Sequence, residues 1–247
     1  MNKILILSGA GKPAISACNI YTERLGNVYD LVIVEERIPF SSIITFIKKK
    51  LKKEGMFYVL NFIFLRFFKM LFLSDREVNR TYKPSLVTDS INSNRVCQLL
   101  EEGDYDFLIT NACSILKPET IKCSKSKIFN LHNGINPKYR GTGNFWAYYN
   151  KDYECVGTTV HYLDEGVDTG EVISILPDDG TILRNSFADI DIHAFEMGAR
   201  EICNIINGKE PFGVGTNFMG LESKCYTYPG FTDFIRSKKN FEKYKSE

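Results

Sequence analysis

Apolar runs of strand length alternate with stretches of helical spacing along much of the chain. The strand-like runs cover residues 4–7, 31–35 and 107–110, and helix-like stretches cover residues 14–24 and 92–102. Alternation of this kind is typical of parallel sheets whose strands are joined by helices. The pattern therefore predicts a doubly wound α/β fold with a mostly parallel sheet and helices on both faces.

The second half of the chain continues this pattern. Residues 156–163 and 172–176 have the length and apolar content of strands. Residues 189–206 place apolar side chains at helical spacing, which predicts a helix that packs on the sheet. These apolar positions are Ile192, Phe195, Ala199, Ile202 and Ile206. Ligands of such folds bind outside the carboxyl ends of the strands, so we expect the functional site in the loops that follow them.

Residues 38–80 interrupt the alternation. A lysine-rich cluster at 48–53 precedes an apolar stretch at 56–73, which is broken by Asn61, Arg66 and Lys69. A membrane-spanning helix needs about twenty predominantly apolar residues, so we expect no span. We expect an inserted helical pair that covers the core or a partner subunit, as in a homodimer. This pair could also form a wall of the site that binds a substrate. Association with a membrane surface through the lysines and aromatic side chains is the alternative.

Charge and cysteine content narrow the function classes. The 247 residues include 31 basic and 30 acidic side chains, for a formal net charge of +1, which disfavours a general nucleic-acid binder. The seven cysteines include no C-x-x-C pair, so we expect reduced thiols in a cytoplasmic protein. The first apolar run is too short for a signal peptide and fits a first strand.

Three side chains combine an amide, an imidazole and a carboxylate. Asn130 and His132 are two positions apart in a run that ends a predicted strand, so they project from the same face. Asp168 follows in a loop bracketed by Gly166 and Gly170, where its carboxylate can be held against the imidazole. The pattern predicts a site at which a donor, a titratable ring and an anion meet.

The reaction class follows from what this set lacks. No serine or cysteine lies in a nucleophile-elbow pattern, and the three histidines have no metal-ligand spacing, so we expect no metal. The attacking atom is then expected to come from a substrate amine. Asn130 would donate to the oxyanion, and His132 would do the same or move the amine proton. Asp168 would orient His132 and raise its pKa by favouring the imidazolium.

Other candidates have structural interpretations. His161 lies in an apolar run and is expected to be a packed histidine, whereas His193 is expected on a helix surface. Trp146 is expected in the core, although an aromatic ring near the site can also stack on a pterin or nucleobase. The segment 9–12 is expected to be a structural turn, with contact to an acceptor phosphate or sugar as the alternative. Residues 226–247 are expected to form a loosely packed extension.

Two linked segments carry a family resemblance. The run N-L-H-N-G-I-N-P-K-Y-R-G at 130–141 and the run V-G-T-T-V-H-Y-L-D-E-G-V-D-T-G-E-V-I at 156–173 stand in order. Together they resemble the catalytic core of the folate-dependent formyltransferases. That family includes methionyl-tRNA formyltransferase, glycinamide ribonucleotide transformylase and the sugar N-formyltransferases.

The resemblance implies a fold, a co-substrate and a set of residues. It implies a Rossmann-like core at 1–207 with an insertion at about 38–80, followed by a short extension at 208–247. It implies 10-formyltetrahydrofolate as formyl donor and Asn130, His132 and Asp168 as catalytic residues. The implied folate-binding residues are Asn111, Ala112, Cys113, Ile115, Leu116, Asp164 and Glu165. The implied acceptor-binding residues are Gly9, Gly11, Lys12, Asn133, Lys138, Tyr139 and Arg140.

The acceptor is expected to be an amino sugar linked to a nucleotide. Residues 133–137 depart from the turn usual in enzymes that act on methionyl-tRNA or glycinamide ribonucleotide, and residues 143–147 look like those of surface-sugar pathways. Methionyl-tRNA and glycinamide ribonucleotide remain alternative acceptors. A catalytically silent folate-binding or membrane-docked module with the same fold is the alternative outside the enzymes.

Overall fold

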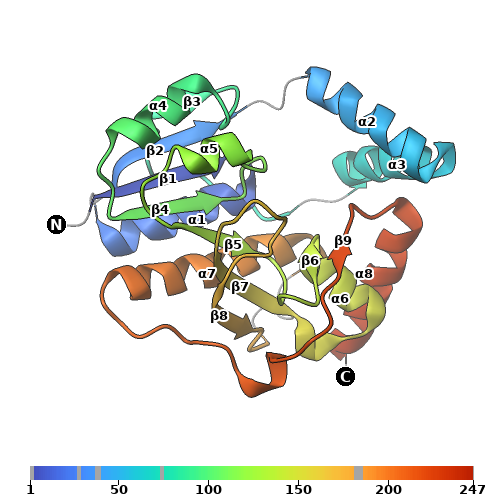
Figure 1. The fold of residues 1–247 in the computed structure, drawn as a ribbon. Helices are drawn as coiled ribbons and strands as arrows, with labels where there is room; N and C mark the ends of the chain where they lie inside the picture. Colours follow the sequence, from blue (N-terminus) through green and yellow to red (C-terminus); the bar gives the residue numbers. More distant parts are fainter. Residues whose placement is uncertain (1–2, 27–28, 37–39, 73–74, 181–185, 247) are drawn as a thin grey trace.

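A seven-stranded sheet forms the centre of the molecule (Figure 1). The computed structural model describes residues 3–26, 29–36, 40–72, 75–180 and 186–246. The strand order is β3-β2-β1-β4-β5-β7-β8. Strands β1 to β5 are parallel, whereas β7 and β8 are antiparallel to their neighbours. The strands are β1 (Ile4–Gly9), β2 (Tyr29–Glu35), β3 (Leu86–Thr88), β4 (Phe107–Asn111), β5 (Ile128–His132), β7 (Gly157–Tyr162) and β8 (Val172–Pro177).

Helices cover both faces of this sheet. On one face α1 (Lys12–Leu25) and α7 (Ile190–Ile206) bury Tyr21 and Ile202 in a cluster with Ile6 of β1. On the other face α4 (Asn94–Glu102) buries Leu100 against Leu108 of β4, next to α5 (Pro118–Lys122). The predicted mostly parallel α/β sheet with two helical layers is confirmed. Successive side chains of a buried strand supply both layers, so β1 is apolar at nearly every position.

Two helices occupy the segment predicted to be an insertion. Helices α2 (Phe40–Glu54) and α3 (Met56–Phe72) follow β2 and turn at Gly55, whose φ is +85°. The ring centroids of Phe46 and Phe62 lie 5.4 Å apart and join the two helices. Figure 1 shows this hairpin beside the sheet, next to α8. Among the described residues, no helix has the length and apolar content needed to cross a bilayer.

The C-terminal segment is packed against the body. Helix α8 (Phe231–Ser246) buries Phe234 and Phe241 in a third cluster, which includes Tyr148 of α6 (Gly143–Asn150) and Leu65 of α3. The short strands β6 (Arg140–Gly141) and β9 (Cys225–Tyr226) form a separate parallel pair. The expectation of a loosely packed extension is therefore wrong for residues 226–246. The apolar residues of this segment stand singly among lysines, so the sequence pattern did not indicate that one face of the helix is buried.

Two cysteines differ from the expectation. Cys97 of α4 forms a disulfide with Cys123, which directly follows α5. The expectation that every cysteine is a reduced thiol is wrong for this pair, because two residues 26 positions apart are brought together only by the fold. The other five cysteines are free.

The packing of α8 predicts a large stability effect. Phe241 is fully buried, and its ring lies 5.1 Å from Tyr148 and 5.4 Å from Phe187. Phe241→Ala is expected to lower the free energy of unfolding by about 3–5 kcal/mol, because it leaves a cavity. Ile235→Ala on the same helix is the control, since that side chain is 43% exposed and should cost under about 1 kcal/mol. Urea denaturation measures both, and equal small effects would contradict the packing described.

Candidate active site

Strand β5 places Asn130 and His132 on one face. Phe129 and Leu131 point into the layer with α1 and α7, whereas Ile128 packs on the opposite layer with α4. Residues of the same parity share a face, so Asn130 and His132 emerge on the side of Ile128 at the carboxyl end of the strand. Both side chains line one cavity, as their spacing predicts.

The amide of Asn130 is held by two neighbours. Its Oδ1 accepts a hydrogen bond from the hydroxyl of Thr110 on β4 at 2.7 Å. Its Nδ2 lies 3.0 Å from Nε2 of His161 on β7 and donates to it, while Nδ1 of His161 donates to the Tyr162 carbonyl at 2.8 Å. The oxygen is thus turned towards β4, and one N–H of the amide is left for the cavity.

The ring of His132 is fixed at both nitrogens. Its Nε2 donates to the carbonyl oxygen of Tyr139 at 2.6 Å, and its Nδ1 lies 3.3 Å from Oδ2 of Asp168. A β-carbon on Gly134 would lie 2.9 Å from this Nε2, so the glycine leaves room for the ring. Because Nε2 carries the donated proton, Nδ1 of the neutral ring carries none and faces the Asp168 carboxylate.

Asp168 has a backbone conformation that its partners hold in place. Its φ is +51°, in the left-handed region, and its carbonyl accepts from Nδ2 of Asn136 at 3.1 Å. Its Oδ2 accepts from the backbone N–H of Gly141 at 2.9 Å. Burial would raise the pKa of the Asp168 carboxyl, but His161, the charge of His132 and the Gly141 N–H together lower it to about 2. The group is therefore an anion throughout the physiological range.

The pKa of His132 is shifted opposite to the expectation. Burial lowers this pKa, and the attraction of Asp168 and the Tyr139 carbonyl offset burial only in part. The expected rise towards an imidazolium is therefore wrong. The sequence showed the carboxylate but not the depth of the ring, whose side chain is only 4% exposed. A neutral His132 is suited to accept a proton.

The expected packing of His161 is confirmed, since its side chain is fully buried, whereas the expectation for His193 is wrong. His161 lies in a strand as expected, yet it contacts Asn130 and lies 3.6 Å from Oδ1 of Asp168, so it belongs to the same cluster. The antiparallel register, which pairs Asn130 with His161, is the signal that would have revealed it. His193 is buried, with Nδ1 3.4 Å from Glu196, so the expectation of a helix surface is wrong.

A cavity of about 560 Å³ opens above this cluster. Loops after β4 and β5, the β7–β8 loop, the start of α7, residues 225–228 and α2 supply its walls. Phe46 and Lys50 of α2 line it, which fits the expectation that the insertion forms a wall. Sequence reasoning missed several lining residues because they come from distant segments: Thr110, Phe46, Lys50, Tyr226, Thr227 and Tyr228.

Most of the predicted folate-binding residues line this cavity. They are Ala112, Cys113, Ile115, Leu116 and Asp164. The loop that carries the first four is anchored where Oε2 of Glu35 accepts from the Ser114 N–H at 2.8 Å. Asn111 instead points into the core and donates to the Ala14 carbonyl at 2.9 Å, and Glu165 lies on the surface 3.4 Å from Lys122.

The predicted acceptor-binding residues are more scattered. Asn133 lines the cavity and donates to Oδ1 of Asp191 at 2.7 Å. A β-carbon on Gly9 would lie 2.1 Å from the Ala112 carbonyl oxygen, so the close approach of the two backbones explains why a glycine stands at this position. The other predicted residues do not line the cavity. Gly11 caps α1, and Lys12 pairs with Asp75. Lys138 and Tyr139 contact Asp152, and Arg140 donates to the Val167 carbonyl.

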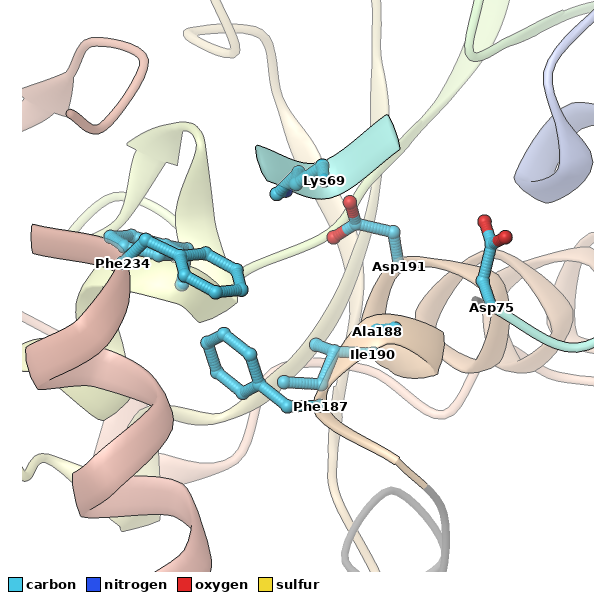
Figure 2. A pocket seen from close by; sticks show the side chains of 8 residues that line it. Lys69, Asp75, Phe187, Ala188, Ile190, Asp191 and Phe234 are labelled. Carbon is cyan, nitrogen blue, oxygen red and sulfur yellow. The ribbon is translucent and has the colours of Figure 1, made fainter. Parts of the chain in front are cut away.

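A second cavity, of about 370 Å³, adjoins the first (Figure 2). Phe145, Phe187 and Phe234 line one side of it, and Asp75 lies on the other. Figure 2 shows the carboxylate of Asp191 pointing towards Lys69 of α3. Asp191 lines both cavities, so it stands at their junction.

Comparison with known proteins identifies the domain. Residues 75–179 match the family model described as formyl transferase, and the match includes Asn130, His132 and Asp168. Residues 75–179 are thus similar to the formyl transferase family. Methionyl-tRNA formyltransferase of Finegoldia magna is 30% identical over 127 residues, which cover 50% of this chain and 40% of that protein. The corresponding protein of Clostridium tetani is 29% identical over 154 residues, which cover 61% and 48%. The chain thus spans less than half the length of these relatives.

Solved structures share the fold of this chain. A sugar N-formyltransferase from Shewanella sp. FDAARGOS_354 aligns over 98% of this chain and 88% of its own, with a TM-score of 0.54 and 13% identity. An N-formyltransferase from Helicobacter canadensis, solved with folinic acid and dTDP-3-aminofucose, aligns over 99% and 82%, with a TM-score of 0.52 and 18% identity. At these identities the likeness establishes the fold.

The burial of His132 predicts its titration. Its imidazole is expected to titrate below about 6.5, the usual value, because burial outweighs the attraction of Asp168. Asp168→Asn should lower this pKa further, since it removes the negative charge that favours the imidazolium. Titration of the histidine ring signals by NMR measures both values, with His132→Gln to assign the resonance. A pKa above the usual value, or a rise in the Asn variant, would contradict this account of the site.

Proposed function

We propose that this chain transfers a formyl group from 10-formyltetrahydrofolate to a primary amine. The observation that carries the proposal is the cluster of Asn130, His132 and Asp168 at one wall of an open cavity. It combines a fixed amide donor, a neutral ring and a lasting anion. These are the groups that attack of an amine on a formyl carbon requires.

Asn130 stabilises the developing negative charge. Its amide is oriented by Thr110 and His161, so the donor needs no reorientation when the formyl oxygen becomes an oxyanion. One such donor contributes about 2.7–4 kcal/mol to lowering a barrier. His161 is a positioning residue in this scheme, since it acts through the amide.

His132 and Asp168 handle the proton of the attacking amine. Nδ1 of the neutral ring accepts this proton by way of the Asp168 carboxylate that faces it or of one water, while Nε2 keeps its hydrogen bond to the Tyr139 carbonyl. The imidazolium formed is then paired with the Asp168 carboxylate, which lies 3.3 Å away. Asp168 thus stabilises the charged form when it arises, although burial keeps the resting ring neutral. The bond between the formyl carbon and the folate nitrogen would then break, and the proton held by His132 would pass to that nitrogen, which releases tetrahydrofolate and the formylated amine.

The cavity wall suits a folate. A pterin offers a flat ring with polar edges, and the wall combines apolar side chains with backbone polar groups of an anchored loop. Ile115 is 73% exposed at this wall, Val167 is 40% exposed, and Leu116 and Leu163 line it as well. When bound there, 10-formyltetrahydrofolate supplies the electrophilic formyl carbon. We assign Ala112–Leu116 and the loop around Asp164 to its binding.

For the acceptor we propose an amino sugar linked to a nucleotide. Asp191 at the junction of the cavities is placed to attract the amine, and Asn133 orients it through their 2.7 Å hydrogen bond. The aromatic lining of the adjoining cavity supports a ligand with a ring (Figure 2). The fold is also shared with solved sugar N-formyltransferases. Methionyl-tRNA is the second candidate, favoured by the curated relatives.

The domain assignment accompanies this proposal. We assign the catalytic domain to residues 1–207, with the insertion at about 38–80, and a C-terminal extension to residues 208–247. The packing of α8 on α6 supports a role for the extension in shaping the site. A cytoplasmic location and a homodimer stay predictions.

Site variants test the reaction. Asn130→Ala and His132→Ala are each expected to lower turnover at least about a hundredfold, because each removes a group that acts on the transition state. Asp168→Asn should also be severely impaired. Formyl transfer is measured with 10-formyltetrahydrofolate against a dTDP-linked amino sugar, methionyl-tRNA and glycinamide ribonucleotide.

Measurements of folate binding and of folding distinguish a loss of catalysis from a loss of structure. Folate binding, followed by calorimetry, and the circular dichroism spectrum should be unchanged in Asn130→Ala. Lys125→Gln is the matched control, since that side chain is exposed and does not line the cavity. Near-normal turnover in folded Asn130→Ala or His132→Ala would refute the site. Transfer to methionyl-tRNA alone would refute the proposed acceptor while leaving the reaction class intact.

A further inference from the structure

Helix α3 presents an uninterrupted apolar stripe to the outside. Seven of its side chains are between 46% and 76% exposed, although all are large and apolar. At 100° per residue they fall within an arc of about 120°. The stripe consists of Met56, Phe57, Leu60, Ile63, Phe64, Phe67 and Leu71. An exposed apolar stripe of this size usually marks a binding surface.

The charged residues of α3 lie outside this arc. The guanidinium of Arg66 stands over the rings of Phe62 and Tyr228, at 5.3 and 5.9 Å from their centroids. The ammonium of Lys69 lies 5.1 Å from the ring centroid of Phe234. Both therefore lie against rings of the body on the side of α3 away from the stripe, although each side chain is still exposed. The stripe contains no polar side chain at all among the described residues of α3.

Positive charge is concentrated at one end of the same hairpin. Residues 48–54 hold five lysines against one glutamate, a net charge of +4, whereas the whole chain carries +1. Lys50 faces inwards, between the rings of Phe46 and Tyr58 and near Glu54. The other four lysines are exposed, and only the turn at Gly55 separates them from the start of the stripe. They are Lys48, Lys49, Lys52 and Lys53.

We propose that the α2–α3 hairpin docks this protein on an anionic lipid surface. The stripe would enter the boundary between headgroups and acyl chains, and the four exposed lysines would lie among the anionic headgroups. A protein partner fits less well, because protein interfaces mix polar and apolar contacts and this stripe has no polar group to pair. A second copy would cover the stripe but would leave the concentrated positive charge without an anion.

The docking hairpin also borders the candidate active site. Phe46 and Lys50 of α2 line the 560 Å³ cavity from the inner side of the hairpin. Tyr58 of α3 donates to the carbonyl of Tyr228, which belongs to the cavity wall, at 2.6 Å. One hairpin thus has a lipid-facing outer side and a site-facing inner side. The cavity would consequently be held close to the membrane surface.

Vesicle binding of the full chain tests the proposal without any substrate. The protein is mixed with vesicles of phosphatidylcholine alone or of phosphatidylcholine with phosphatidylglycerol, and the bound fraction is measured by flotation. Binding is expected with the mixed vesicles and not with phosphatidylcholine alone. It should weaken as salt rises from about 0.1 to 1 M, because the Debye length falls from about 10 to 3 Å.

Two sets of variants separate the charge from the stripe. Replacing Lys48, Lys49, Lys52 and Lys53 by Gln is expected to weaken binding to mixed vesicles at least about a hundredfold. The matched control replaces four other exposed lysines by Gln and should bind as the wild type does. The control positions are Lys83, Lys125, Lys151 and Lys209. Phe57→Ser with Phe67→Ser keeps the charge and should weaken binding at least about tenfold.

The outcomes decide between occupants of the stripe. Circular dichroism and analytical ultracentrifugation of each variant show whether it is folded and whether it self-associates. No binding of the wild type to mixed vesicles would overturn the proposal. Equal loss in the two four-lysine sets would also overturn it, since the effect would then reflect general charge. A stable wild-type dimer that Phe57→Ser with Phe67→Ser dissociates, without vesicle binding, would assign the stripe to a second copy.

Discussion

The antiparallel pairing of β5 with β7 determines the arrangement of the candidate active site. Its register sets Asn130 opposite His161 and His132 opposite Thr159. Because β7 runs antiparallel to β5, it ends beside the start of β5, where the Leu163 N–H donates to the Ile128 carbonyl at 2.8 Å. The loop that follows folds back over β5 and brings Asp168 to His132. This folded-back loop completes the cluster, because it sets Asp168 against both His132 and His161.

Burial and charge act in opposite directions on this cluster, and the balance differs between its members. For Asp168 the surrounding donors outweigh burial, so the carboxyl stays ionised. For His132 burial outweighs the neighbouring carboxylate, so the ring is held neutral. The Asp168 anion and the neutral His132 ring form no ion pair before a proton is transferred. The favourable interaction becomes available when a proton arrives, which suits a group that must gain charge during a reaction.

The sequence predicted the sheet and the shared face of Asn130 and His132 because both depend on short-range pattern. Alternating apolar runs indicated β1, β4 and β5, and the two-residue spacing put Asn130 and His132 on one face. Pairing between distant segments left no such pattern. The contact of Asn130 with His161 depends on strand register, and the wall formed by Phe46 and Tyr228 depends on how an insertion meets a C-terminal segment. The depth of His132, which reverses its pKa shift, follows from the same long-range packing.

The parallel pair of β6 with β9 ties the C-terminal segment to the catalytic carboxylate candidate. Gly141 of β6 pairs with Tyr226 of β9, and its N–H is the one that holds Asp168. A β-carbon on Gly141 would lie 2.2 Å from the Tyr226 carbonyl oxygen, so the two backbones meet at the closest distance that a glycine allows. Exchange of C-terminal segments between relatives would therefore have to transfer residues 140–142 and 225–228 as one unit. The two stretches therefore act as one structural unit, although they are far apart along the chain.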